Sequence, residues 1–245
     1  MKNKNYKKLI STLLLGAVLS SSIISGCSTS EIKDTKKILD GLSKFNEELN
    51  KNNKKENNEN KIENLDVSIQ ELVSQIEIEE PSEEYYDRDE YSAYQSYEYG
   101  GETYDSVRDY SYYASIYYND KTEEYYDCYN GETTTGGPKG FDFEHIVPLH
   151  FVNQHGGDEW SNEAKVAYAN NPSIGVSVNQ RDNRVKSDKG PSEWLPSENI
   201  EDYCYTWLVI LADYDLSCTQ EDMDVLLDNV ENVPAEELDY LPTYK

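Results

Sequence analysis

Apolar and polar positions divide the chain into segments of different character. Residues 9–24 are mostly apolar and follow four lysines, whereas residues 28–60 hold few large apolar side chains among Lys, Glu and Asn. A segment of the second kind cannot bury enough apolar surface to fold alone. We therefore predict a signal segment at residues 1–26, a partly helical acidic tether at residues 27–100, a folded domain at residues 101–232 and an extended acidic tail at residues 233–245.

The predicted tether contains two patterned stretches. Between Ile62 and Ile78, apolar residues recur three and four positions apart, which predicts an amphipathic helix that ends before Pro81. The pattern leaves open whether this helix packs on the domain or pairs with another chain. Residues 85–129 hold 15 tyrosines in 45 positions, interleaved with acids. Tyrosines can stack on bases, but the acids repel phosphate, so a half-packed tyrosine layer is the preferred interpretation.

The folded domain combines strand and helix patterns. The stretches Phe141 to Leu149 and Ile174 to Val178 are rich in β-forming residues, and a short helix is expected to begin near Asn183. Apolar residues at helical spacing predict further helices over Asn199 to Tyr214 and from Thr219 to about Asn229. The predicted fold class is therefore α+β.

The N-terminal segment has the features of an export signal. Four lysines precede the apolar stretch, and small residues lead to Cys27 in I-S-G-C. This pattern is typical of bacterial lipoprotein signals, in which the cysteine is lipidated and becomes the mature N-terminus. The apolar stretch is short for a bilayer span, which needs about 20 apolar residues. We therefore expect an extracytoplasmic protein that is lipid-anchored to the bacterial cell membrane through Cys27.

The remaining cysteines are Cys128, Cys204 and Cys218. An exported protein can hold a disulfide. Three candidates leave one cysteine unpaired, and the sequence does not choose the pair.

The net charge restricts the partners that the chain can bind. The formal charge is −26, and removal of residues 1–26, which hold four lysines and no acids, changes it to −30. Such a surface repels nucleic acids and anionic membranes at long range. A polyanionic substrate would therefore need a local basic patch and a cation. Four basic residues against two acids, Asp182 and Asp188, give a local balance of +2: Arg181, Arg184, Lys186 and Lys189. A solvated helix face with i to i+4 pairing is the alternative interpretation of these four residues.

All three histidines lie within eleven residues: His145, which follows Glu144 directly, His150 and His155. Zinc binding through the three is disfavoured, because five-residue steps along a strand put successive side chains on opposite faces. Glu144 and His145 also point to opposite faces of a regular strand, so we expect the chain to bend near them, at Pro148. Exposed or structural roles are expected for His150 and His155, with His150 also a candidate for lining a cleft.

Three separated blocks in one order carry a resemblance to a known family. They are E-H-I-V-P-L from Glu144, W-S-N-E-A-K-V-A-Y-A-N-N-P from Trp160 and N-R-V-K-S-D-K-G-P-S-E-W-L-P from Asn183. The sequence resembles HNH nucleases of the ββα-metal fold, in particular secreted bacterial proteins related to the C-terminal domain of GmrSD-type restriction enzymes. The resemblance implies a ββα-metal core with surrounding helices.

The resemblance also implies residue roles that elementary chemistry supports. Glu144 and Asn183 match the metal-ligand positions, and their oxygens suit Mg²⁺, with Mn²⁺ or another divalent ion as alternatives. His145 matches the general base that takes a proton from the attacking water. The four basic residues of the patch are the expected phosphate contacts. The implied activity is metal-dependent endonuclease cleavage of phosphodiester bonds, with DNA rather than RNA as the expected substrate.

One position departs from the family pattern. Ile174 occupies the place of an asparagine that usually holds the loop orienting the catalytic histidine, and Asn170 or Asn171 are candidates to replace it. This departure supports an alternative hypothesis, a catalytically weak HNH-fold lipoprotein that binds a protein or the cell wall. An inhibitor or other partner protein is also conceivable, but the sequence does not identify one.

Overall fold

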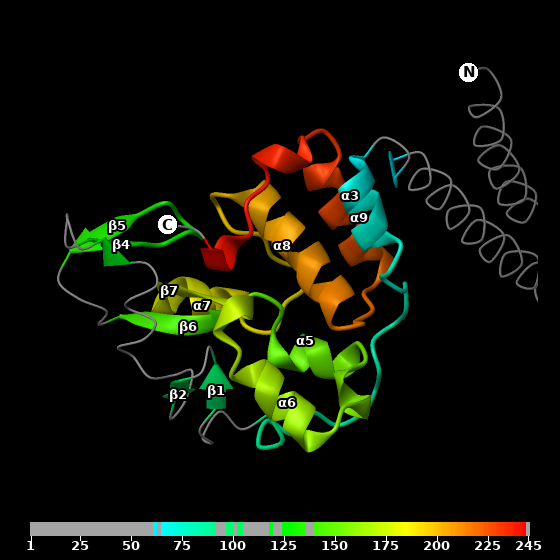
Figure 1. Ribbon diagram of the computed structural model, residues 1–245, viewed down its shortest axis with the longest axis horizontal. Helices are drawn as coiled ribbons and strands as arrows, with labels where there is room; N and C mark the ends of the chain where they lie inside the picture. Colours follow the sequence, from blue (N-terminus) through cyan, green and yellow to red (C-terminus); the bar gives the residue numbers. More distant parts are fainter. Residues whose placement is uncertain are drawn as a thin grey trace, which may run out of the picture. The chain divides into compact units, whose positions relative to one another are not determined.

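The computed structural model describes residues 61–62, 65–91, 97–99, 102–104, 118–119, 124–135 and 140–243. The fold class is α+β, as predicted from the sequence, because small antiparallel sheets are combined with helices (Figure 1). The signal segment, Cys27 and the first part of the predicted tether lie outside the described residues. No helix within the described ranges is long and apolar enough to cross a membrane.

The described strands form antiparallel sheets of two or three strands. Two short sheets come from the tyrosine-rich part of the chain and the segment after it: β1 (Tyr97–Tyr99) with β2 (Glu102–Tyr104), and β3 (Tyr118–Asn119) with β4 (Glu124–Tyr126) and β5 (Thr133–Thr135). A further sheet pairs β6 (Phe141–His145) with β7 (Gly175–Asn179). The turn after β4 is joined to β7 by buried Asp127, whose carboxylate accepts the backbone N–H of Asn179 at 2.8 Å.

A strand, strand and helix unit lies at the centre of the candidate site. In the β6–β7 ladder, Glu144 lies opposite Val176 and His145 opposite Gly175. Helix α7 (Gln180–Lys186) follows β7 directly, because the Asn179 side chain caps its N-terminus, and it packs against both strands. The second strand is therefore found where the sequence predicts it, whereas the short helix begins at Gln180, directly after the strand and three residues before the expected start at Asn183.

The first strand is shorter than predicted. It ends at His145, and Leu149, which was expected in the strand, begins helix α5 (Leu149–Gln154) with Pro148 as N-cap. Proline lacks the N–H that a ladder requires, so the chain turns there. The expected bend near Pro148 is thus present, and it is the start of a helix.

A layer of helices buries the apolar core. Helix α8 (Ile200–Asp213) packs against α9 (Gln220–Val230), and α6 (Asn162–Ala169) lies beside α5 (Figure 1). The predicted helix starts are confirmed, since Thr219 caps α9 by accepting the Asp222 N–H. Trp207 of α8 is fully buried, and its ring meets Phe151 of α5 edge-on at 4.9 Å. Short 3-10 turns η1 (Gly157–Glu159) and η2 (Pro172–Ile174) connect these elements.

The folded unit begins well before residue 101, so the expected boundary there needs correction. Helix α3 (Val67–Val73), with buried Ile69, packs on α8, and Ile78 forms a bridge to Cys218. The amphipathic pattern therefore reflects packing on the domain, which was one of the two alternatives left open. Burial of this apolar stripe is favourable enough to fix the segment, despite the polar residues around it.

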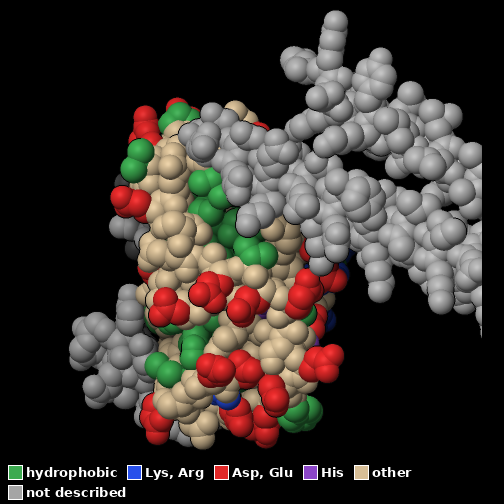
Figure 2. Space-filling model, turned by 90° about the vertical axis from the view of Figure 1, so that its right-hand side faces the viewer, with side chains coloured by type: hydrophobic (Ala, Val, Ile, Leu, Met, Phe, Trp, Pro, Cys, Tyr) green, Lys and Arg blue, Asp and Glu red, His purple; other side chains and the backbone are tan. Residues whose placement is uncertain are grey.

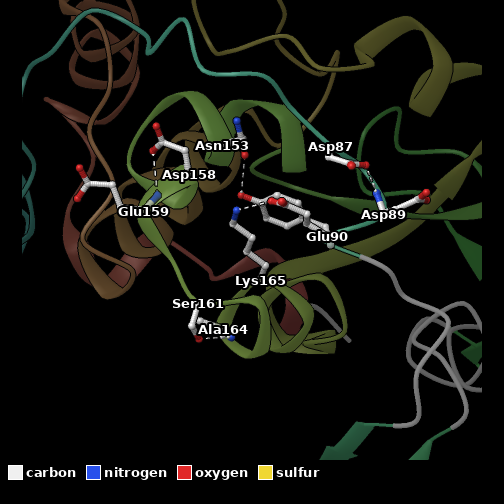
Figure 3. A network of polar contacts seen from close by, with 10 residues as sticks. Asp87, Asp89, Glu90, Asn153, Asp158, Glu159, Ser161, Ala164 and Lys165 are labelled. Carbon is white, nitrogen blue, oxygen red and sulfur yellow. Dashed lines mark hydrogen bonds and ion pairs between the residues drawn. The ribbon is translucent and has the colours of Figure 1, made fainter.

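Residues 79–91 are also fastened to the domain. Tyr91 is buried and donates its hydroxyl to Asn153 of α5 at 3.3 Å. Beside it, the Lys165 ammonium of α6 pairs with Glu90 at 2.5 Å (Figure 3). These contacts hold the residues just before Tyr91 in a defined place. Two of those residues, Tyr86 and Arg88, line the candidate site.

The acidic tail is packed rather than extended. Leu238 and Leu241 are buried, the second within η4 (Leu241–Thr243), which follows η3 (Ala235–Glu237). The Tyr240 hydroxyl donates to the Ser173 carbonyl at 2.6 Å. The prediction of an extended tail was therefore wrong for residues 233–243, because the two leucines bury their side chains against the core.

The three described cysteines carry no disulfide. Cys128, Cys204 and Cys218 are each buried as free thiols. Burial raises the pKa of Cys204 and of Cys218 to about 12, so these thiols stay protonated and behave as small apolar side chains.

Candidate active site

The predicted catalytic and metal-binding residues line one cavity. Glu144 and His145 at the end of β6 and Asn183 of α7 border a cavity of about 410 Å³. The ladder places β6 beside β7, and α7 begins where β7 ends, so residues almost 40 positions apart reach the same hollow. The same cavity is also lined by the start of α5, by Asp188, and by Tyr86 and Arg88.

His145 is oriented by a backbone carbonyl. Its Nε2 lies 2.8 Å from the Ala169 carbonyl oxygen, which can only accept a hydrogen bond. The proton of the neutral ring is therefore on Nε2, and Nδ1 carries the lone pair. The Phe143 ring packs edge-on against the imidazole at 4.9 Å.

Main-chain contacts fix the segment around Ile174. Ile174 is buried, and its carbonyl accepts the Ile146 N–H at 3.1 Å, which ties the end of β6 to the start of β7. Asn170 donates to the Val166 carbonyl, and Asn171 donates to the Tyr214 hydroxyl and caps η2. The two asparagines thus stabilise the segment that carries the Ala169 carbonyl.

Lys186 lies inside the site and not on its surface. Its side chain is fully buried, its ammonium contacts Glu144 Oε1, and it donates to the His145 carbonyl at 3.1 Å. An ammonium in this position cannot meet a phosphate on the protein surface. The predicted phosphate contact at Lys186 is therefore replaced by a positioning role for Glu144 and His145.

Burial dominates the electrostatics of this pair. It raises the pKa of Glu144 to about 7, and the Lys186 ammonium opposes that shift. It lowers the pKa of Lys186, which the carboxylate of Glu144 opposes. Both shifts favour the neutral forms, because desolvation penalises charge. A cation bound at Glu144 would favour the ionised carboxylate instead.

Two oxygen donors fit a divalent cation. Glu144 Oε2 is buried and has no hydrogen-bond partner among the described residues, while Oε1 is engaged by Lys186. Asn183 Nδ2 donates a hydrogen bond to Asp142 Oδ2 at 3.4 Å. The amide oxygen of Asn183, the atom that would bind an ion, therefore points away from Asp142. Within the described ranges, no three His, Cys, Asp or Glu side chains converge on one point. One carboxylate and one amide, with water completing the shell, is the kind of set that Mg²⁺ accepts.

The other members of the basic patch are differently placed. Arg181 and Arg184 are exposed on α7, whereas the Lys189 ammonium donates to the Val185 carbonyl at 2.8 Å. Arg88 is exposed and lines the cavity, yet the sequence assigned it to the tether. No local sequence pattern predicts that Arg88 lies at the site, because tertiary contacts with residues far along the chain place it there.

The other two histidines differ in setting. His150 lies on the cavity wall, and its Nδ1 is 2.9 Å from Asp188 Oδ2. His155 is buried, stacks on Phe151 at 4.1 Å and bonds Ser217 at 3.2 Å. Burial lowers the pKa of His155 to about 4. His155 thus has the structural role expected of it, while His150 belongs to the candidate site.

Acidic side chains dominate much of the surface around the fold. Figure 2 shows Asp and Glu side chains scattered over one face, with few Lys or Arg among them. A separate hollow of about 840 Å³ is bordered by acids that include Glu77, Glu79 and Asp158. A polyanion would be repelled from these faces, which leaves the cavity with Arg88 and α7 as the better approach.

The chain is similar to an uncharacterized secreted protein from Arthroderma benhamiae, with 29% identity over 109 residues. The match covers 42% of this chain and 52% of the relative, so the chain spans about half the relative's length. No family model and no solved structure matches the chain. This likeness does not establish a family, so the geometry of the site is the basis for assigning a function.

Proposed function

We propose that the chain is a metal-dependent HNH endonuclease that hydrolyses phosphodiester bonds, with DNA as the substrate, and that it is lipid-anchored outside the cell membrane. The observation that carries the proposal is the convergence of Glu144, His145 and Asn183 on one cavity. The resemblance to HNH nucleases singled out these residues, and the cavity that they share supports their assignment to one site. The secreted relative is in keeping with an exported protein.

His145 supplies the base. With its Nε2 proton held by the Ala169 carbonyl, Nδ1 accepts a proton from water as the water oxygen attacks phosphorus. Phe143 on one side of the ring and the Ala169 carbonyl at its Nε2 restrict the imidazole to this orientation. The fixed tautomer removes the need for a rearrangement before each turnover.

Glu144 and Asn183 would hold the cation through one carboxylate oxygen and one amide oxygen. A bound divalent ion supplies positive charge against the charge that develops on the phosphate and the leaving oxygen. Lys186 holds the other carboxylate oxygen and the His145 carbonyl together, and so keeps the ligand and the base in register. Among the described residues, Arg88 on the cavity wall and the exposed Arg181 and Arg184 of α7 are cations that could contact substrate phosphates.

Cleavage of supercoiled plasmid by the purified full-length chain, with Mg²⁺, Mn²⁺ or EDTA, tests the proposal. We expect cleavage with metal and none with EDTA, and a loss of at least about 10²-fold in the His145→Ala variant, because that variant lacks the base. Circular dichroism should show the variant folded. A wild-type protein that leaves DNA and RNA intact with every metal would exclude the enzyme.

Metal binding offers a readout that does not depend on activity. Calorimetric titration with Mn²⁺ should show binding to the wild type that is about 10-fold or more weaker in Asn183→Ala, which lacks the amide oxygen. Asn232→Ala is the matched control, because Asn232 is exposed and bonds only its neighbour Glu231. Equal affinities in the two variants would remove Asn183 from the ligand set.

A catalytically weak binding module is the second candidate. The contact of Lys186 with Glu144 favours it, because the ammonium competes with a cation for the same carboxylate. The acidic face in Figure 2 would then meet a basic protein or cell-wall surface. Absence of Mn²⁺ binding in the calorimetric titration would favour this module over the enzyme.

A further inference from the structure

The cavity contains a second histidine whose surroundings differ from those of His145. His150 stands in the first turn of α5, five residues after His145, and borders the same hollow of about 410 Å³. Its side chain is 36% exposed, so solvent and a ligand can reach it. The short connection through Pro148 brings both imidazoles to one cavity, which a continuous strand would not do.

Two contacts fix the His150 ring. Its Nδ1 lies 2.9 Å from Asp188 Oδ2, and the Tyr86 ring lies 5.0 Å away at an interplanar angle of 36°. A carboxylate only accepts hydrogen bonds, so Nδ1 carries a proton. The hydrogen bond from His150 also lowers the pKa of Asp188, which keeps this carboxylate charged. Nε2, on the opposite side of the ring, has no hydrogen-bond partner among the described residues.

The two histidines therefore have complementary settings. His145 meets a neutral carbonyl that selects the ring with a lone pair on Nδ1, whereas His150 meets a carboxylate that gives the doubly protonated ring a counter-charge. The other charged groups on the cavity wall are Glu144, already engaged by Lys186, and Arg88. Pairs of titratable groups in contrasting environments are the usual basis for dividing acid and base roles.

We propose that His150, held by Asp188, is the general acid that protonates the leaving sugar oxygen, an inference that rests on the proposed nuclease function. As the water oxygen forms its bond to phosphorus, the bond from phosphorus to the sugar oxygen breaks, and its electron pair stays on that oxygen. The Nε2 proton of His150 goes to this oxygen, while His145 Nδ1 takes the proton from water. The sum is addition of one water, and both rings then exchange protons with solvent.

Two substrates with different leaving groups test this role. A DNA duplex releases a basic alkoxide that needs a proton, whereas bis(p-nitrophenyl) phosphate releases a stable phenolate that does not. With the full-length chain and Mn²⁺, we expect His150→Ala to lose about 10²- to 10⁴-fold in kcat on DNA and less than about 3-fold on the nitrophenyl ester. Asp188→Asn should show the same selective loss at smaller size.

Controls separate this role from others. Gln154→Ala, on the same helix but outside the cavity, should keep both activities, and His150→Gln repeats the test in case the alanine variant fails to fold. Equal losses on both substrates, a rise in KM on DNA with kcat retained, or no loss at all would each overturn the general-acid role while leaving the nuclease in place. A wild type that cleaves neither substrate would overturn both proposals.

Discussion

Replacing Lys186 by methionine tests the positioning role of this residue most directly. The change removes the ammonium but keeps a long side chain, and it leaves Glu144 buried without its counter-charge. Breaking a buried pair in this way costs about 3–5 kcal/mol. Protonating the carboxyl instead limits the loss, because the wild-type carboxyl already has a pKa of about 7, so holding it neutral at pH 8 costs about 1.4 kcal/mol more than in the wild type. The two routes together predict a fall in melting temperature of roughly 3–20 °C.

The loss should depend on pH in a defined direction. Without Lys186, the pKa of Glu144 in the folded protein rises further above its unfolded value, so the folded state binds the additional proton. The penalty is then small below pH 7, where both folded proteins hold this carboxyl protonated, and grows as pH rises above 7. Urea unfolding should therefore show a loss near 1 kcal/mol or less at pH 5 and the full loss at pH 8.

Two further variants decide between electrostatics and packing. Lys186→Met combined with Glu144→Leu should recover most of the stability at pH 8, because no unpaired charge remains. Lys189→Met, at a partly exposed lysine that bonds only a backbone carbonyl, should lose less than about 1 kcal/mol. A loss below 1 kcal/mol in Lys186→Met at pH 8, or no recovery in the double variant, would refute the reasoning.

The remaining predictions concern His155 and Gly175. Burial lowers the pKa of His155 to about 4, so between pH 6.5 and 4 the unfolded chain binds more protons and stability falls as pH falls. From pH 7 to 4.5, urea unfolding should show a loss about 2–3 kcal/mol larger in the wild type than in His155→Gln; equal pH slopes would contradict this. In Gly175→Ala, the added Cβ would lie 2.0 Å from the Phe143 ring, so we expect a loss of about 1–3 kcal/mol. Displacement of Phe143 from His145 should also lower kcat on plasmid, and unchanged stability and cleavage would argue against this close contact.

Local patterns accounted for the central unit of the fold. The β-forming runs around Phe143 and Val176, the capped helix that contains Asn183 and the helix start at Thr219 are all found near their predicted positions. These features depend on residues close together in the chain, through propensity, capping and the missing N–H of Pro148. The acidity of the chain and the clustering of the histidines were likewise visible without a structure.

Local patterns could not predict the roles of residues whose contact partners lie far away in the sequence. Lys186 was assigned to phosphate by its neighbours in sequence, but its contact with Glu144, 42 residues away, puts it in the interior. Arg88 was assigned to a tether, although Glu90 and Tyr91 beside it are held by α6 and α5. In both cases the deciding interaction is a tertiary contact, which leaves no periodic signal in the sequence.

The sequence by itself determined the α+β class, because propensity and capping are local, and its resemblance to HNH nucleases singled out Glu144, His145 and Asn183 as the candidate site. Only the tertiary structure decided which groups serve that set. The Ala169 carbonyl selects the tautomer of His145, Lys186 holds Glu144, and Asp188 brings His150 into the cavity. The physical reason is that hydrogen bonds and desolvation depend on which groups meet in three dimensions, and this meeting is set by the packing of the whole domain.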